Sequence, residues 1–167
     1  YIHAPEHLKA IARELVLQHR RYIESYIKMY PEFARTLRPW HIKGPAPLII
    51  QDMITAGKKT GVGPMAAVAG AIAEHLGIGL LSYTDEVMVE NGGDVFLKTN
   101  RPVIIGIFAG NSPLSLRVGL RVNSESKPLS VCTSSGTVGH SLSLGKADAV
   151  CVISESCALS DAAATSI

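Results

Sequence analysis

Glu86-Val-Met-Val-Glu90-Asn-Gly-Gly-Asp94-Val-Phe-Leu-Lys-Thr99 predicts a β-hairpin in the middle of the chain, and with it the class of the fold. The runs 86–90 and 95–99 are rich in residues that favour strands, and Asn91-Gly92-Gly93 between them is a strong turn signal. A hairpin joins antiparallel strands. The sheet that contains this hairpin is therefore expected to be antiparallel.

Helical patterns precede the hairpin. Apolar residues recur at helical spacing over 5–30, where Pro31 ends the pattern, and over 48–59. A short turn is expected over 32–37. A third helix is predicted from Pro64, which suits a helix start, to about Leu76. Its segment Met65-Ala-Ala-Val-Ala-Gly-Ala-Ile-Ala-Glu74 is built almost wholly of small residues, so we expect it to be buried with other backbone close against it.

Further strands follow the hairpin, and a helix ends the chain. Strands are predicted over 103–108, 115–122 and 149–153, and a helix from Ala158 onward. Because helices come first and antiparallel strands follow, the order favours an α+β fold with helices on one face of an antiparallel sheet.

Composition and charge limit the function classes. The 167 residues are 47% hydrophobic and 18% charged, which indicates one compact domain over 1–167. A formal charge of +2 is too small to predict a nucleic-acid partner. Residues 1–43 hold eight Lys/Arg against four Asp/Glu. That basic segment is either a solvated helix face or a surface that faces an anion.

Cysteine usage and hydropathy predict the compartment. Cys132, Cys151 and Cys157 form no CxxC motif and are odd in number, so neither a disulfide framework nor a zinc site is indicated. We expect a reducing, cytoplasmic setting. No uninterrupted run of about 18 apolar residues predicts a membrane span. Because the chain begins at Tyr1 and stops at Ile167 inside a predicted helix, we expect the domain to be truncated at both ends.

Asp161 and Thr165 are four residues apart, so they project from one helix face. Both offer oxygen, which suits Mg²⁺ or Ca²⁺ better than zinc. The alternative is that Asp161 only favours the helix N-terminus through the macrodipole, after a Ser160 cap. Spacing alone favours this alternative.

The loop Thr133-Ser-Ser-Gly-Thr-Val-Gly-His140-Ser141 is dense in hydroxyls. Its backbone amides could hold an anion, or its hydroxyls could bond their own backbone in a turn. His140 is a candidate general base, although a lone histidine is more often structural. Cys132 beside this loop is either a nucleophile or a small strand residue.

Taken together, several motifs resemble an uncharacterised conserved family distantly related to ApbE. They are Val62-Gly-Pro-Met-Ala-Ala-Val-Ala-Gly70, Glu90-Asn-Gly-Gly-Asp94, Cys132-Thr-Ser-Ser-Gly-Thr-Val-Gly-His-Ser141, and Ala147-Asp-Ala149 through Asp161-Ala-Ala-Ala-Thr165. ApbE proteins are flavin transferases that move FMN from FAD onto a Thr or Ser with Mg²⁺. The resemblance implies a T-fold-like α+β architecture and a cytoplasmic, ApbE-like protein.

The resemblance also implies roles for residues. Asp161 and Thr165 match the side chains that hold Mg²⁺ in ApbE, and His140 is the candidate catalytic residue. The residues expected to bind FAD or another phosphorylated ligand are Glu90, Asn91, Gly92, Gly93, Asp94, Thr133, Ser134, Ser135, Gly136, Thr137 and Ser141.

The sequence also departs from ApbE. Met65 stands where ApbE typically has a flavin-side Lys, and Gly70 where it typically has an Asp. The ApbE stretch containing His-Ile-Ile-Asp-Pro is absent.

The first hypothesis is therefore a transferase-like protein that binds a phosphorylated ligand, with a flavin nucleotide as the implied example, and a divalent metal. The alternatives are a non-catalytic binding relative, or an accessory protein in anaerobic sulfur assimilation that uses Cys132 and His140. The small-residue helix and the strand runs also suggest a homo-oligomer.

Overall fold

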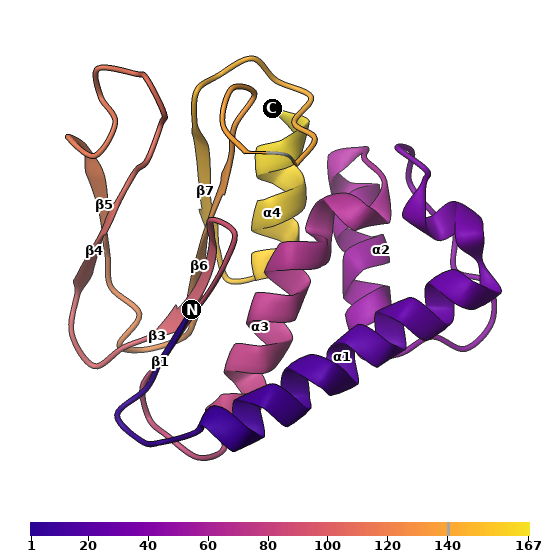
Figure 1. The fold of residues 1–167 in the computed structure, drawn as a ribbon, viewed down its shortest axis with the longest axis horizontal. Coiled ribbons are helices and arrows are strands. Elements are labelled where there is room, and N and C mark those ends of the chain that lie inside the picture. Colours follow the sequence, from indigo (N-terminus) through magenta and orange to yellow (C-terminus); the bar gives the residue numbers. More distant parts are fainter. Residues whose placement is uncertain (140) are drawn as a thin grey trace.

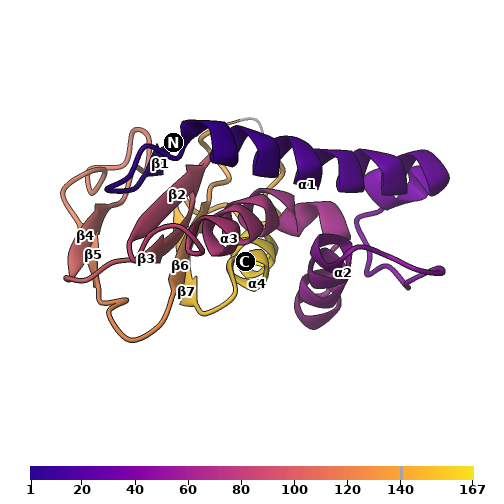
Figure 2. The same cartoon turned by 90° about the horizontal axis from the view of Figure 1, so that it is seen from below.

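A computed structural model, which describes residues 1–139 and 141–167, has three layers. Helices cover one face of a five-stranded sheet, and a two-stranded ribbon stands on the other side (Figure 1; Figure 2 shows the same layers from below). The predicted α+β class, with helices and an antiparallel sheet, is confirmed.

The main sheet has the strand order β1-β2-β3-β6-β7, and each neighbouring pair is antiparallel. The ribbon pairs β4 with β5. The strands are β1 (Ile2–His3), β2 (Val87–Asn91), β3 (Asp94–Lys98), β4 (Val103–Gly106), β5 (Gly119–Val122), β6 (Leu129–Ser134) and β7 (Val150–Ser154). The predicted hairpin is β2–β3, with Asn91 opposite Asp94.

The helices follow the predicted order. They are α1 (Lys9–Met29), η1 (Pro31–Ala34), α2 (Leu48–Thr60), η2 (Pro64–Ala67), α3 (Val68–Leu80) and α4 (Cys157–Ser166). The third helix begins as a 3₁₀ turn at Pro64 and ends later than predicted, at Leu80. Among the described residues, no single helix is both long and apolar enough to span a membrane. The pair Leu48–Thr60 with Pro64–Leu80 passes that test jointly on length and composition, although its halves are bent by 109°.

Three apolar clusters hold the layers together. One joins α1, η1, α2 and α4 around Tyr26 and Phe33, which are fully buried. A second lies between α3 and the sheet, where Phe96 and Leu80 are buried. The third fills the space between the sheet and the ribbon, with Leu97 at its centre. Each cluster removes large apolar side chains from water, which is the dominant favourable term in folding.

Helix α3 lies close to its neighbours, as its small residues predicted. A Cβ added at Gly70 would lie 2.4 Å from the carbonyl oxygen of Cys157 in α4. A Cβ at Gly77 would lie 2.1 Å from the ring of Phe96 in β3. Glycine at these two positions therefore lets α3 contact α4 on one side and the sheet on another.

Some predicted strands differ from the observed ones. The strand expected over 115–122 is only β5, because the backbone at Leu116 has a φ of 57° and interrupts the ladder. β4 ends at Gly106 rather than at Phe108. β1 and β6 were not predicted. β6 is a central strand with buried residues on both faces, so it lacks the alternation that marks a half-exposed strand.

Candidate functional site

A pocket of about 940 Å³ opens between the tip of the β2–β3 hairpin, the start of α3, the loop after β6 and the end of α4. We call it the main pocket. Most of the predicted site residues line it, although they are far apart in sequence. They are Glu90, Asn91, Gly92, Gly93, Asp94, Thr133, Ser134, Ser135, Ser141, Asp161 and Thr165. Its volume lies in the range typical of small-molecule sites.

The hairpin tip forms one wall of the main pocket. Gly92 and Gly93 have φ of 66° and 104°, the left-handed values that a tight two-residue turn requires. Asn91 Nδ2 donates to the carbonyl of Ala69 at 3.0 Å, and Glu90 Oε1 accepts from the Gly93 amide at 3.3 Å. The tip is thereby held against the start of α3.

Helix α4 brings Asp161 and Thr165 to the opposite wall. The helix begins at Cys157, and Ser156 is its N-cap, with Oγ accepting from the Leu159 amide at 3.3 Å. The predicted Ser160 cap is wrong: Ser160 lies inside the helix, fully buried, and its hydroxyl pairs with Ser130 and Ser154. Asp161 therefore lies beyond the first turn of α4, where the macrodipole effect has faded.

Two carboxylates cap the helices reciprocally. Asp161 Oδ2 on α4 accepts from the amide of Gly70, the third residue of α3, at 2.8 Å. Glu74 Oε2 on α3 accepts from the amide of Ala158, the second residue of α4, at 3.1 Å. First-turn amides have no partner inside their own helix, so each helix supplies the acceptor that the other lacks.

Asp94, which is buried, and Asp161, which is partly buried, have raised pKa values. Burial raises the pKa of Asp94 to about 7, against opposing hydrogen bonds from Cys132 and Thr133. Burial and the charge of Asp94 raise the pKa of Asp161 to about 8, against hydrogen bonds from Gly70 and Ala69. Both effects arise because a carboxylate loses water and faces a like charge, which disfavours the ionised form.

The hydroxyl-rich loop is partly closed on itself. Ser135 Oγ accepts from the amides of Thr137 and Val138 at 3.1 and 2.9 Å, and the Gly136 amide donates to the Ala147 carbonyl at 2.9 Å. Thr137 Oγ1 donates to Asp148 at 2.8 Å. Gly136 and Thr137 are not among the residues that line the main pocket. This part of the loop therefore forms a turn in which the hydroxyls bond their own backbone, rather than an anion site. The amides of Gly136, Thr137 and Val138 already have acceptors.

Other hydroxyls remain open toward the main pocket. Ser134, Ser141 and Thr165 line it, and within residues 1–139 and 141–167 their hydroxyls have no hydrogen-bond partner. The predicted catalytic His140 lies outside the described residues, so the structure does not place it.

Apolar residues form the rest of the lining, and sequence reasoning did not predict them as site residues. Met65 comes from η2, Ile105 and Phe108 come from β4 and the segment after it, and Leu142 and Leu144 follow the hydroxyl loop. Phe108 is 57% exposed. No signal in the sequence indicated this role, because Phe108 was predicted to lie inside a strand. In the structure its exposed ring marks a wall that an apolar part of a ligand could contact.

Cys132 fits the strand-residue interpretation. It is fully buried, its Sγ lies 3.4 Å from that of Cys157, and both thiols are free. Its hydrogen bond with Cys157, together with burial, raises the pKa of the Cys132 thiol well above its ordinary value. A nucleophilic cysteine needs the opposite, an accessible thiol with a lowered pKa.

The described residues contain no cluster of three or more His, Cys, Asp or Glu side chains able to hold a metal ion. The oxygen donors that line the pocket include the carboxylates of Asp161 and Asp94 and the hydroxyl of Thr165. Hard oxygen donors of this kind suit Mg²⁺, which usually keeps several waters and takes one or two carboxylates together with substrate phosphate. The donor types are therefore those that Mg²⁺ takes, but the described residues alone do not make up a complete ion site.

Comparisons with known proteins match the whole chain to one family. The model of the family described as "AbpE bacteria" matches residues 1–167. UPF0280 proteins of Methanococcus aeolicus and Methanocaldococcus jannaschii are 43% and 46% identical, over 94% and 93% of this chain. A UPF0280 protein of Methanococcus vannielii is 42% identical over 94% of it. The matched regions span 64%, 64% and 65% of these relatives.

Proposed function

The chain belongs to the family described as AbpE bacteria, and from this membership and the lining of the main pocket we propose that it binds a phosphorylated ligand together with a divalent cation. One observation supports this most: the hairpin tip, the hydroxyl loop and the Asp161–Thr165 helix face, distant in sequence, line a single pocket. The proposal extends to the T-fold-like architecture that the ApbE resemblance implies.

Asp161 and Thr165 are the proposed cation ligands. The ionised forms of Asp94 and Asp161 are costly in this pocket, since burial raises the pKa of Asp94 to about 7 and of Asp161 to about 8. A divalent cation would offset that cost and let both groups ionise. When bound, Mg²⁺ would neutralise phosphate charge and polarise a phosphoryl oxygen.

The phosphate group itself would contact hydroxyls rather than amides. Ser134 and Ser141 line the main pocket, whereas the amides of Gly136 and Thr137 are occupied within the loop. Met65, Ile105 and Phe108 would face the apolar part of the ligand. A flavin nucleotide such as FAD combines these two parts, which is why we favour it among phosphorylated ligands.

Transfer is the proposed chemistry if turnover occurs. A hydroxyl oxygen of an acceptor Thr or Ser would bond to the phosphorus of the FMN half of FAD, and the bond from that phosphorus to AMP oxygen would break. His140 would accept the hydroxyl proton, and AMP would leave. The His140→Ala variant should then bind FAD with unchanged affinity but release no AMP in the presence of a Thr-containing acceptor peptide.

A binding protein without turnover is the second candidate. Met65 lines the main pocket at the position where ApbE typically has a Lys, and Gly70 replaces an Asp and contacts α4 instead. The lack of this Lys and this Asp favours a protein that binds the ligand but does not transfer part of it. If the unmodified chain binds FAD tightly but releases no AMP, the binding protein is favoured over the transferase.

Calorimetric titration of FAD, FMN, ADP and riboflavin, each with and without Mg²⁺, tests the proposal. We expect the phosphorylated compounds to bind more tightly with Mg²⁺ than without it, and riboflavin, which lacks phosphate, to show no Mg²⁺ dependence. Failure of all three phosphorylated compounds to bind in the presence of Mg²⁺ would overturn the proposal.

A cytoplasmic setting and self-association stay proposals. The cytoplasmic setting is supported by the free thiols of Cys132 and Cys157, whose sulfur atoms are 3.4 Å apart without a disulfide. Self-association is supported by exposed apolar side chains on the ribbon layer, including Ile104 and Leu116.

A further inference from the structure

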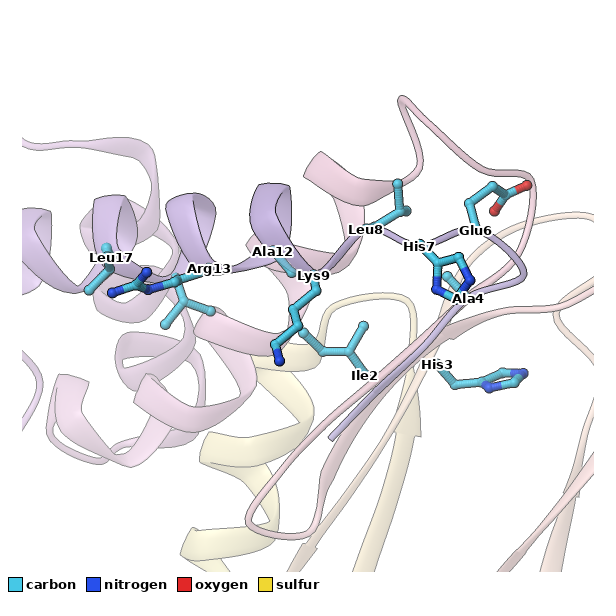
Figure 3. Close-up of a pocket in the computed structure, with 11 residues that line it drawn as sticks. Ile2, His3, Ala4, Glu6, His7, Leu8, Lys9, Ala12, Arg13 and Leu17 are labelled. Carbon is cyan, nitrogen blue, oxygen red and sulfur yellow. The ribbon is translucent and has the colours of Figure 1, made fainter.

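A second pocket, of about 530 Å³, lies between strand β1, the turn that follows it and the first two turns of α1 (Figure 3). We call it the β1–α1 groove. It shares no lining residue with the main pocket.

One stripe of α1 forms the wall of the β1–α1 groove. Lys9, Ala12, Arg13, Val16 and Leu17 line it, at positions i, i+3, i+4, i+7 and i+8. This spacing places them on one face of the helix. The stripe therefore combines two cations with an apolar floor, to which Ile2 contributes from β1.

Lys9 and Arg13 are the two cations of the stripe. Within the described residues, neither the Lys9 ammonium nor the Arg13 guanidinium has a carboxylate at ion-pair distance. Glu6 is the one acidic residue in the lining, and its carboxylate points away from both cations along the turn (Figure 3). By contrast, Arg20 further along α1 pairs with Glu24 at 2.9 Å.

We propose that the β1–α1 groove binds an amphiphilic anion, a molecule with an apolar chain and a carboxylate or phosphate head. The chain would lie on Ile2, Val16 and Leu17, where it would remove partly exposed apolar surface from water. The head would accept hydrogen bonds from Lys9 and Arg13, of which the guanidinium can grip a carboxylate or phosphate with two parallel bonds. This assigns a role to Lys9 and Arg13, two of the eight cations in the basic segment 1–43.

The test uses the full chain and three ligands with a straight chain of ten carbons, which in decanoate includes the carboxyl carbon: decanoate, decyl phosphate and decyltrimethylammonium, all below their micelle concentrations. We expect both anions to bind, the cation to bind at least about tenfold more weakly, and backbone NMR shifts to concentrate at Ala4, Ala12 and Val16. Equal affinity for the cation, or shifts confined to the main pocket, would overturn the proposal.

Two charge reversals on α1 form a matched pair. Arg13→Glu, in the groove, should weaken decanoate at least about tenfold, whereas Arg21→Glu, exposed on the same helix but outside the groove, should change it little. If both variants weaken decanoate equally, general attraction to the basic helix explains the binding and the site is refuted. Leu17→Asn should weaken decanoate but not acetate, since it removes apolar surface without adding charge and only decanoate has a long chain to place on the floor.

A last experiment distinguishes binding of a free amphiphile from binding to a lipid surface. Monomeric decanoate should bind with the same affinity whether or not vesicles of phosphatidylglycerol and phosphatidylcholine are present. Binding to those vesicles without any binding of monomeric decanoate would contradict the groove as a small-molecule site.

Discussion

Asp161 has two roles that compete for one carboxylate. Its Oδ2 accepts from the Gly70 amide and so caps α3, while the same side chain lines the main pocket as a proposed cation ligand. The carboxylate also accepts from the backbone of Ala69, so a cation would share its oxygens with these two amides. The cap needs only an acceptor atom, whereas the cation needs negative charge, and a substitution that separates these properties distinguishes the roles.

Asp161→Asn keeps an acceptor for Gly70 but removes the charge. We expect Mg²⁺ affinity, measured by calorimetry, to fall at least about tenfold. The melting temperature at pH 8 should not fall, because the variant no longer has to bury a charged carboxylate. Asp148→Asn, at an exposed carboxylate that contacts Thr137 outside the main pocket, is the control. Equal loss of Mg²⁺ affinity in both variants would contradict the assignment of Asp161.

The buried carboxylates also predict how stability depends on pH. The pKa of Asp94 is raised from 3.8 to about 7 and that of Asp161 from 3.8 to about 8, so between pH 4 and 8 the folded chain holds protons that the unfolded chain has released. Stability from these groups is therefore complete below pH 4 and is lost as pH rises through 7 and 8.

Without Mg²⁺, thermal melts should show Tm falling by roughly 5 °C or more between pH 5 and 8. The double variant Asp94→Asn with Asp161→Asn should flatten this slope, and saturating Mg²⁺ should do the same for the unmodified chain. A slope that persists unchanged in the double variant would show that other groups cause it.

At the scale of elements, the α3–α4 contact connects the fold with the site. Gly70 lets the backbone of α4 approach α3, and this approach brings Asp161 within 2.8 Å of the Gly70 amide. Glu74 binds the start of α4 in return. The two helices therefore position Asp161 and Thr165 relative to the hairpin tip, which Asn91 ties to Ala69 of α3.

Two glycines of α3 provide a matched test of this contact. Gly70→Ala places a Cβ 2.4 Å from a backbone carbonyl of α4, which has no easy way to move, so we expect a loss of about 2 kcal/mol or more in unfolding free energy. Gly79→Ala meets only the flexible side chain of Leu15, whose nearest methyl group is at 2.9 Å, and should change stability by less than about 1 kcal/mol, since alanine favours the helix. Urea unfolding measures both. Equal losses would show that helix propensity, and not the α4 contact, matters at Gly70.

Elements with a local signal were predictable from sequence. Asn91-Gly92-Gly93 indicated the hairpin, and the small residues around Gly70 indicated close backbone packing, because turn geometry and side-chain size are local properties. β6 was missed because a central strand buried on both faces has no alternation. The pairing of Asp161 with Gly70, 91 residues apart, and the apolar wall around Phe108 depend on tertiary contacts that no local pattern encodes.

At the scale of the whole molecule, the ribbon layer exposes several large apolar side chains. The sheet's helical face is packed by α1, α3 and α4, whereas segment 103–122 exposes Ile104, Phe108, Leu114 and Leu116. Phe108 also lines the main pocket. A second copy of the chain placed on this layer would bury these side chains and add a wall to that pocket, so self-association and ligand binding should be linked.

Light scattering after size exclusion tests this prediction. We expect the full chain to form a dimer, and we expect the dissociation constant of that dimer to fall when the ligand of the main pocket is present. The reason is that the second copy would add a wall to the pocket, so the ligand would bind the dimer more tightly than the monomer. Ile104→Asp with Leu116→Asp should yield a monomer, since each puts a charge where apolar surface would be buried. Leu48→Asp, at an exposed leucine on the helical layer, should leave the dimer intact. A monomeric unmodified chain, or equal disruption by Leu48→Asp, would contradict association through the ribbon.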